Sequence, residues 1–401
     1  MKKLYSVFAV AAVICGSLFF CGCAMVNGEP LGNHNKDPRF VVIGAVLPLS
    51  GPDAVYGKRM LAGLRFAEFE LNSRRGISGK RMKLLPFDSK GTAEGAEIAF
   101  ESAVAAGAEG VIAGYSSTEA NAIAPLANLY RIPSIMPMAT SDVASGTYLV
   151  RNSYTDQQQG EALAAYLWYW RQLIRISVLI DSDLDAVYER NTARVTAKAF
   201  RDLGGVITNM PEYRKNNFAK AVELALITGP QAVVVSARGE LAAKIVTLLR
   251  QKGYKGVICG LDSWDDDIFF RNLNQLKDPG DCVYVSFFTP ENPAEEFLDF
   301  RNGFRQKYFH DPGSCETMSY DALKMLAIGL NNAQTEYDFR TNWLSIHNYF
   351  GAAATYTALN DGGIDRTMFI NAVDPAQTGD VSAGGRLIRS FMHSKLQSYR
   401  Y

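Results

Sequence analysis

Small hydroxyl side chains follow two strand-like segments of the chain, at the points where these segments end. Ser117 lies in Gly114-Tyr-Ser-Ser-Thr118, after an apolar run and at the start of a helix-like segment. Free N–H groups at a helix start and the helix dipole both favour an anion, so Ser117 and these amides could bind a carboxylate. Thr140, in Met136-Pro-Met-Ala-Thr140, repeats this arrangement, and the backbone of Met138 can approach the same anion. Ordinary helix capping is the alternative role for each hydroxyl taken singly.

An aromatic side chain follows another strand-like segment. Residues 41–47 form a short apolar run rich in β-branched residues, which is typical of a parallel strand buried on both faces. Ser50 and Asp53 could cap the helix that follows. Tyr56 then lies near the carboxyl end of the strand, in the crevice where open α/β sheets bind small molecules. Packing of Tyr56 on its own helix is the alternative.

The chain lacks the enzymatic motifs that the sequence allows us to test. Gly76-Ile-Ser-Gly-Lys80 lacks the first glycine and the hydroxyl residue of a phosphate-binding loop, and it fits a turn between a helix and a strand. No Gly-x-Gly-x-x-Gly follows the first strand, and no Gly-x-Ser-x-Gly elbow occurs. The four histidines are too scattered for a helical metal pair. We therefore predict a protein that is not an enzyme and needs no cofactor or metal.

A dense acidic run, Asp262-Ser-Trp-Asp-Asp-Asp267, follows a strand-like segment. Several carboxylates in one loop could bind a divalent cation. Acidic loops are more often simply solvated, and we expect a solvated loop here.

The N-terminal segment predicts export. It opens with a basic n-region, continues with the apolar residues 4–20, and ends with a glycine before Cys23, so that residues 1–22 fit a secretory signal. A small residue directly before a cysteine resembles the lipobox of bacterial lipoproteins, in which the cysteine is diacylated after cleavage. Residues 23–39 are polar and fit a flexible tether. An ordinary cleaved signal is the alternative.

Length, charge and cysteine content narrow the rest of the chain. Cleavage before Cys23 would leave enough residues for two domains. The chain carries 41 basic and 41 acidic residues and no clustered basic stripe, so nucleic acid is not an expected partner. Cys282 and Cys315 are a candidate disulfide of an exported protein. Cys259, in an apolar run, is expected to be a buried thiol.

Strand-like and helix-like segments alternate from Phe40 onward, which is typical of parallel sheets covered by helices. The alternation restarts once, so we predict two sheets, with the chain crossing between them near residues 151–156. The segment after Cys282 is expected to return and complete the first unit. The expected strands are 41–47, 81–87, 110–114, 133–138, 175–181, 231–237, 256–260 and 283–287, and the expected helices include 93–106, 119–130, 157–171, 186–203, 218–226, 240–252, 293–309 and 319–331.

Four short motifs occur in the order found in one family of binding proteins. They are Leu49-Ser-Gly-Pro with Tyr56-Gly57, Gly114-Tyr-Ser-Ser-Thr, Met138-Ala-Thr140 and Gly260-Leu-Asp262. From about Phe40 to Asn331 the chain resembles the type I periplasmic binding proteins of the leucine/isoleucine/valine-binding branch, which serve branched-chain amino acid ABC transporters.

The resemblance implies an α/β fold of two Rossmann-like lobes with parallel sheets, joined by a multi-strand hinge and closing on the ligand like a Venus flytrap. It places residues 40–154 and 287–350 in the first lobe. Residues 155–286 and 351–401 fall in the second lobe.

The resemblance also implies roles for first-lobe residues. Ser117 and Thr140 match the hydroxyl residues that hold the ligand α-carboxylate, with the backbone of Met138 and Ala139 beside them. Tyr56 matches an aromatic wall of the side-chain pocket.

In the second lobe, Tyr188 matches a tyrosine near the ligand ammonium group. Asp262 stands where the family has an acidic residue for that group, and a carboxylate suits the role because a cation leaving water needs a charge partner. Arg238 departs from the family, which often has an aromatic residue at this point. Arg238 could pair with an acidic ligand side chain or with Asp262.

The resemblance implies a periplasmic, membrane-anchored lipoprotein that captures an amino acid, branched-chain or otherwise hydrophobic, and delivers it to an ABC transporter permease. A ligand-sensing protein for an amide, urea or aromatic acid would have the same fold and is the first alternative. An enzyme that uses the acidic run 262–267 is the second.

Overall fold

The computed structural model describes residues 25–26, 29–30, 37–141, 148–183, 186–273, 276, 278–374 and 385–396. The predicted signal and Cys23 lie outside these residues. Within the described part, no helix combines the length and the apolar character needed to cross a membrane. Near the N-terminus, β1 (Met25–Val26) pairs with β2 (Glu29–Pro30) as a small antiparallel ladder.

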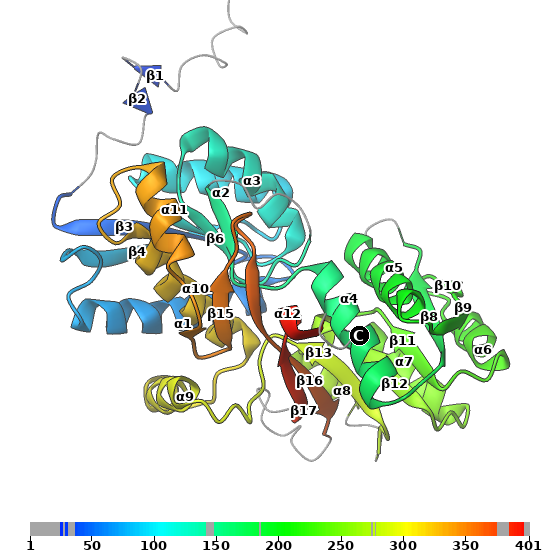
Figure 1. The fold of residues 1–401 in the computed structure, drawn as a ribbon. Coiled ribbons are helices and arrows are strands. Elements are labelled where there is room, and N and C mark those ends of the chain that lie inside the picture. Colours follow the sequence, from blue (N-terminus) through cyan, green and yellow to red (C-terminus); the bar gives the residue numbers. More distant parts are fainter. Residues whose placement is uncertain are drawn as a thin grey trace, which may run out of the picture.

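The first lobe is built on a five-stranded parallel sheet in the order β4-β3-β5-β6-β7. Helices α2 and α3 cover one face of this sheet, and α1 and α10 cover the other (Figure 1). The chain runs from β3 to β4 at one side and then crosses to β5 at the other, so strand order reverses between β3 and β5. The strands are β3 (Phe40–Leu47), β4 (Arg81–Asp88), β5 (Gly110–Ala113), β6 (Ser134–Met136) and β7 (Leu149–Arg151), and the helices are α1 (Ala54–Ser73), α2 (Ala93–Ala105), α3 (Ser117–Tyr130) and α10 (Ser314–Leu330).

The second lobe is built on the parallel strands of a ten-stranded mixed sheet whose main path is β10-β8-β11-β12-β13-β16-β15-β14. Its strands are parallel from β10 to β13 and antiparallel beyond. In addition, β9 pairs with β8 and β17 pairs with β16. The strands are β8 (Arg175–Asp181), β9 (Val206–Asn209), β10 (Glu212–Tyr213), β11 (Ala232–Val235), β12 (Val257–Gly260), β13 (Cys282–Ser286), β14 (Tyr349–Phe350), β15 (Thr355–Ala358), β16 (Ile364–Val373) and β17 (Gly385–Met392).

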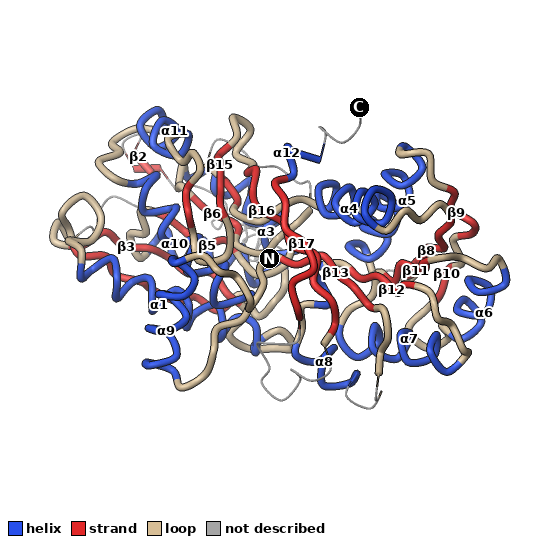
Figure 2. Tube along the Cα trace, turned by 60° about the horizontal axis from the view of Figure 1, so that its bottom comes forward, coloured by secondary structure: helices blue, strands red, loops and turns tan. Residues whose placement is uncertain are grey.

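Helices cover both faces of the parallel part of this second sheet, with α4 and α5 on one face and α6, α7 and α8 on the other (Figure 2). A π-helical turn, Tyr166–Trp170, extends α4, and a 3-10 turn, Asp262–Trp264, follows β12. The helices are α4 (Asp156–Ala165), α5 (Val187–Asp202), α6 (Ala219–Ile227), α7 (Gly239–Gln251), α8 (Asp267–Leu273) and α12 (His393–Leu396), while α9 (Glu295–Tyr308) and α11 (Glu336–Leu344) flank α10 in the chain.

The segments that pass between the two lobes meet at one buried arginine. Arg366, on β16, is 1% exposed. Its guanidinium donates to the carbonyl oxygens of Asn152 (3.0 Å) and Phe287, which lie at the ends of β7 and β13. Figure 2 shows β13, β16 and β17 in the middle of the molecule, between the two groups of helices. One cation thus ties together three segments that are far apart in the sequence.

The predicted alternation of strands and helices is confirmed, with three corrections. Ser50 does not cap α1, because its hydroxyl donates to Asp88 Oδ2 (2.6 Å), and the side chain of Asp53 makes no capping bond. The antiparallel strands β14 to β17 were not predicted individually. The predicted helix 157–171 changes to a π-helical turn at Tyr166.

The predicted Cys282–Cys315 disulfide is wrong, since both residues are free and buried. Cys282 begins β13, where its thiol donates to Pro279 O (3.1 Å), whereas Cys315 lies in the first turn of α10 in the other lobe. Burial raises the pKa of Cys282 to about 12. The buried thiol at Cys259 is confirmed.

Candidate ligand-binding site

Two tyrosines face each other at the point where strand order reverses in the first sheet. Tyr56 lies in the first turn of α1, after β3, and Tyr115 follows β5. Their rings stack with centroids 4.8 Å apart and an interplanar angle of 7°. Tyr115 was not predicted as a site residue, although it directly precedes Ser116 and Ser117 in the sequence. Open α/β sheets bind ligands at such a reversal of strand order, so the carboxyl ends of β3 and β5 are the place where a ligand is expected.

Ser116, not Ser117, caps α3. Its Oγ accepts from the N–H of Glu119 (3.3 Å), and the Glu119 carboxylate in turn accepts from the N–H groups of Tyr115 (3.0 Å) and Ser116 (2.8 Å). The glutamate therefore already occupies two of the amides that we expected to be free. Ser117 is left with a different contact, because its Oγ accepts from the N–H of Ser141 (3.2 Å).

The loop after β6 does not repeat the helix-start design. Thr140 caps no described helix, and Thr155 is the residue that caps α4. Thr140 is 2% exposed, and its carbonyl oxygen accepts from the N–H of Asp156 (2.8 Å). The carbonyl of Ala139 accepts from the Ser153 hydroxyl (2.6 Å). Met138 is partly buried and packs against the core. The Ser141–Ser117 bond nevertheless brings this loop next to the end of β5.

Tyr188 and Asp262 are in direct contact in the second lobe. Tyr188 lies in the first turn of α5, and its hydroxyl donates to the Asp262 carboxylate. The N–H of Asp262 donates to Gln159 Oε1 (3.3 Å). Burial raises the pKa of Asp262 to about 7; the bond from Tyr188 opposes this shift, and the charge of Asp156 adds to it. Asp262 is thus a carboxylate that would gain from a nearby cation.

A buried carboxylate supports this pair from behind. Asp156, 2% exposed, accepts from Gln159 Nε2 (3.2 Å) and from Asn191 Nδ2 (2.7 Å). Gln159 therefore connects Asp156 to the backbone of Asp262. Neither Asp156 nor Gln159 was predicted, because Asp156-Gln-Gln-Gln resembles the exposed first turn of any capped helix.

Arg238 joins the same group from the end of β11. Its Nε donates to Glu189 Oε1 (2.6 Å), and its guanidinium lies over the Tyr188 ring, 5.2 Å from the centroid. The expected alternative of a pair with Asp262 is therefore wrong. The Arg238 side chain remains 57% exposed.

The acidic run is not a solvated loop. The Asp265 carboxylate accepts from Ser286 Oγ (2.6 Å) and from Ser314 of α10. Asp266 accepts from the Tyr56 hydroxyl (3.0 Å), and Asp267 pairs with Arg59 (2.8 Å). These partners lie largely in the first lobe, so the run links the lobes. Among the described residues no group of three histidine, cysteine or acidic side chains could hold a metal ion.

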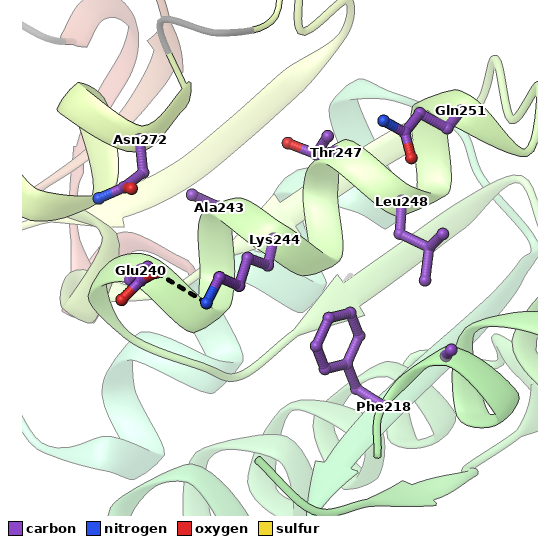
Figure 3. Close-up of a pocket in the computed structure, with 9 residues that line it drawn as sticks. Phe218, Glu240, Ala243, Lys244, Thr247, Leu248, Gln251 and Asn272 are labelled. Atoms are coloured by element: carbon purple, nitrogen blue, oxygen red, sulfur yellow. Dashed lines mark ion pairs between the residues drawn. The ribbon is translucent and has the colours of Figure 1, made fainter. Parts of the chain in front are cut away.

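A separate depression of about 350 Å³ lies on the second lobe beside α7 and is lined by residues of α6, α7 and α8. Figure 3 shows the Glu240–Lys244 ion pair at its edge and Phe218 beneath it. None of the predicted ligand residues lines this depression. It is therefore distinct from the candidate site.

The candidate site thus has two halves, joined where Tyr56 meets Asp266. The first-lobe half offers hydroxyls and stacked rings, and the second-lobe half offers a carboxylate, a tyrosine hydroxyl and a guanidinium. This arrangement can bind a small molecule that carries both a cation and an anion. The roles of the individual residues stay a prediction.

Comparisons with known proteins agree with this architecture. The model of the family described as "Periplasmic binding protein" matches residues 41–380. Leu/Ile/Val-binding protein homolog 1 of Brucella abortus (strain 2308) is 26% identical over 336 residues, which are 81% of this chain and 83% of that protein. Homolog 4 of the same strain is 32% identical over 117 residues, and the match spans only 26% of its length and 29% of this chain.

Solved structures share the two-lobed fold. The isoleucine complex of LivJ, a branched-chain amino acid transporter substrate binding protein from Streptococcus pneumoniae, has a TM-score of 0.74 at 21% identity and covers 88% of this chain and 99% of its own. A solute binding protein of an ABC transporter from Rhodopseudomonas palustris BisB5, in complex with 3,4-dihydroxy benzoic acid, has a TM-score of 0.72 at 15% identity. The match covers 88% of this chain and 98% of that protein. The two-lobed α/β fold is confirmed, and the chain belongs to the periplasmic binding protein family.

Proposed function

We propose that this protein is an extracytoplasmic solute-binding lipoprotein that captures an amino acid between its lobes and delivers it to an ABC transporter permease. Its anchor is the lipid on Cys23, in the periplasm. The first lobe comprises residues 40–154 and 287–350, and the second comprises 155–286 and 351–401. The observation that carries the proposal is the Tyr188–Asp262 pair in the second lobe, opposite the hydroxyls of the first.

The chemistry of the two halves supports an α-amino acid. Asp262 is a partly buried carboxylate with a raised pKa, so a ligand ammonium group would supply the positive charge that it lacks. Ser117 and Thr140 lie on loops joined by the Ser141–Ser117 bond, and both would donate to the α-carboxylate. The names of the Brucella relatives and the isoleucine complex make branched-chain and other hydrophobic amino acids the first ligands to test.

Contacts between the lobes support a closing mechanism. The Tyr56 hydroxyl reaches Asp266 across the interface, four residues after Asp262. A ligand held by Asp262 would therefore strengthen a contact that already draws the lobes together. Closure excludes water, which strengthens the polar contacts to the ligand, and the closed form is what the permease binds.

A thermal-shift screen over the amino acids, followed by calorimetry of the hits, tests this proposal. A ligand that binds only the folded protein raises the midpoint of unfolding by mass action. Asp262→Asn should weaken the best amino acid at least tenfold, since one partner of a charge pair is lost. The Asp262→Asn variant without ligand should not unfold at a lower temperature than the unmodified protein at pH 8. The pKa of Asp262 is raised in the folded state, so its ionised carboxylate destabilises the fold at that pH.

Asp202→Asn, an exposed aspartate on α5, is the matched control and should leave affinity unchanged. An Asp262→Asn variant that binds as tightly as the unmodified protein would contradict the assignment. No shift with any amino acid would contradict the function.

A ligand-sensing protein for an aromatic acid is a second candidate, favoured by the stacked Tyr56–Tyr115 pair and by the Rhodopseudomonas structure with its bound benzoic acid derivative. Such a ligand has no ammonium group. Binding of benzoate-type acids that is insensitive to Asp262→Asn would support this candidate, and the same screen with amides and urea covers the related ligands.

A further inference from the structure

The guanidinium of Arg238 is held in one orientation by its own lobe. Glu189, which is 8% exposed at its side chain, accepts from Nε at 2.6 Å, and the ring of Tyr188 lies beneath the guanidinium plane at 5.2 Å. Among the described residues no hydrogen bond forms to the two terminal nitrogens. An arginine fixed at Nε and by stacking presents its remaining N–H groups as a fork, the geometry that matches a carboxylate.

Arg238 lies at the interface between the lobes, because its neighbour Gly239 packs against the Asp266 carboxylate, which accepts from the Tyr56 hydroxyl of the first lobe. Its positive charge opposes the burial that raises the pKa of Tyr115, and it likewise opposes the burial that raises the pKa of Asp53. Both residues belong to the first lobe. Its charge also acts on the pKa of Asp262, in its own lobe. Arg238 thus stacks on Tyr188, the partner of Asp262, and adjoins the residue that packs against the partner of Tyr56, where the ligand side chain would extend.

We propose that Arg238 binds a second carboxylate at the end of the ligand side chain, so that the preferred ligand is a dicarboxylic amino acid. The inference rests on the proposed function and names its substrate class. Asp262 takes the ammonium group, the first-lobe hydroxyls take the α-carboxylate, and the fork of Arg238 takes the distal carboxylate. A branched aliphatic side chain would desolvate the two terminal nitrogens of this guanidinium without offering them an acceptor, which disfavours such a ligand.

Three ligands of nearly equal size differ in the charged groups that they carry, and so test each group in turn. L-Glutamate carries all three groups, L-glutamine lacks the distal charge, and glutarate lacks the ammonium group. Calorimetry should show that the unmodified protein binds L-glutamate about tenfold to 100-fold more tightly than L-glutamine, since charge-assisted bonds to a guanidinium have that strength. Arg238→Gln should remove this difference by weakening L-glutamate while leaving L-glutamine within about threefold.

Two matched variants complete the test. Arg194→Gln changes an exposed arginine on α5 and should leave the preference intact. Asp53→Asn removes a first-lobe carboxylate on whose pKa the charge of Arg238 acts, and it should leave L-glutamate binding unchanged or tighter. If Asp53→Asn instead weakens binding as much as Arg238→Gln does, Arg238 serves as an interlobe ion pair, and the inference is wrong.

The outcomes also separate this inference from the proposed function. Equal binding of L-glutamate, L-glutamine and L-leucine overturns the role of Arg238 and leaves amino acid capture standing. An equal loss of L-glutamate and L-glutamine in Arg238→Gln assigns the arginine to the α-carboxylate and also overturns it. Binding of glutarate as tight as that of L-glutamate would retain the anion site but contradict recognition of an ammonium group, and so the proposed function.

Discussion

The two halves of the candidate site use different chemistry. In the first lobe, Ser117 is neutral and Tyr56 stacks on Tyr115. The nearby carboxylate of Glu119 accepts from the backbone N–H groups of Tyr115 and Ser116 at the start of α3. In the second lobe, Asp262 and Arg238 carry charges, and burial raises the pKa of Asp262 to about 7. The first half is therefore a shaped surface with fixed hydrogen-bonding groups, whereas the second half responds to charge and to pH.

The difference follows from the local folds. In the first lobe the carboxyl ends of β3 and β5 meet at a reversal of strand order, and a capping box satisfies the amides of Ser116 and Glu119 at the start of α3. In the second lobe the 3-10 turn after β12 places Asp262 near the buried carboxylate of Asp156. Burial raises the pKa of Asp262, and the charge of Asp156 adds to this shift. The groups that act on the pKa of Asp262 thus all belong to its own lobe.

Arg59 is a charged residue of the first lobe, unlike the neutral groups of the first-lobe half of the site. We predict that it contributes to the free energy of unfolding. It pairs with Glu316 (2.8 Å), whose side chain is 1% exposed, and with Asp267 (2.8 Å) in the second lobe. Arg59→Met should lower the free energy of unfolding by about 3 kcal/mol, because it leaves a buried carboxylate without its cation. Urea unfolding followed by circular dichroism measures this loss.

Arg65→Met, on the same helix, is the control. Arg65 forms a partly exposed i,i+3 pair with Glu68 (2.7 Å), and its loss should cost less than about 1 kcal/mol. Equal effects of the two variants would show that the charge of Arg59 contributes no more than an ordinary surface pair.

The strongest test of the second-lobe half is the pH dependence of affinity. Only the ionised form of Asp262 pairs with an ammonium group, and its pKa of about 7 means that the carboxylate is protonated as pH falls below 7. Affinity should be maximal at pH 8 and fall by about 100-fold at pH 5, where roughly one molecule in 100 is ionised. Calorimetry at both pH values with one ligand measures the change.

Asp262→Asn should flatten this profile, since the titrating group is removed. Asp265, whose pKa burial raises to about 6, lies in the same loop but is bound by Ser286 and Ser314. A profile that keeps its slope in Asp262→Asn would assign the proton to another group.

The fold could be predicted because its signals are local. The buried strand β8 is the apolar run Arg175–Asp181 at its predicted bounds, and the helices α2 and α5 differ from the predicted ranges by a residue or two. The antiparallel strands β14 to β17 carry no such signal, because their pairing starts from the tertiary contact of β16 with β13, and the other three strands pair with β16 or with β15. The prediction of a Cys282–Cys315 disulfide was wrong for the same reason, because the spacing of two cysteines in the sequence does not tell in which lobe each one lies.

The site could be predicted only in part. The motif positions of Tyr188 and Asp262 brought two contacting residues together. Contacts between residues far apart in the sequence were not predicted, because each depends on which elements pack together. Examples are those of Tyr115, of Asp156 and between Asp266 and Tyr56. The acidic run looked solvated because its partners lie up to 210 residues away in the chain.

The hydroxyls of the first lobe should have a smaller effect and no influence on pH. Ser117→Ala and Thr140→Val each remove one hydrogen bond to an anion and should weaken the amino acid about threefold to tenfold, with the midpoint of the pH profile unchanged. Ser116→Ala is the matched control. It removes the cap of α3 and should lower the unfolding midpoint while leaving affinity within about twofold.

A shift of the pH midpoint in Ser117→Ala would show that the two halves share one charge network. Loss of affinity in Ser116→Ala equal to that in Ser117→Ala would mean that order at the helix start, not the hydroxyl of Ser117, supports binding.

The smallest effect is expected where the two halves touch. Tyr56→Phe keeps the ring stacked on Tyr115 and removes only the hydroxyl that donates to Asp266 (3.0 Å). Because that bond forms between the lobes, its loss should weaken ligand about twofold to threefold by disfavouring closure. Tyr56→Ala also removes the wall and should weaken binding about tenfold. If Tyr56→Phe binds as the unmodified protein does while Tyr56→Ala shows the full loss, the ring acts as a wall and closure depends on the second-lobe charges and Arg59.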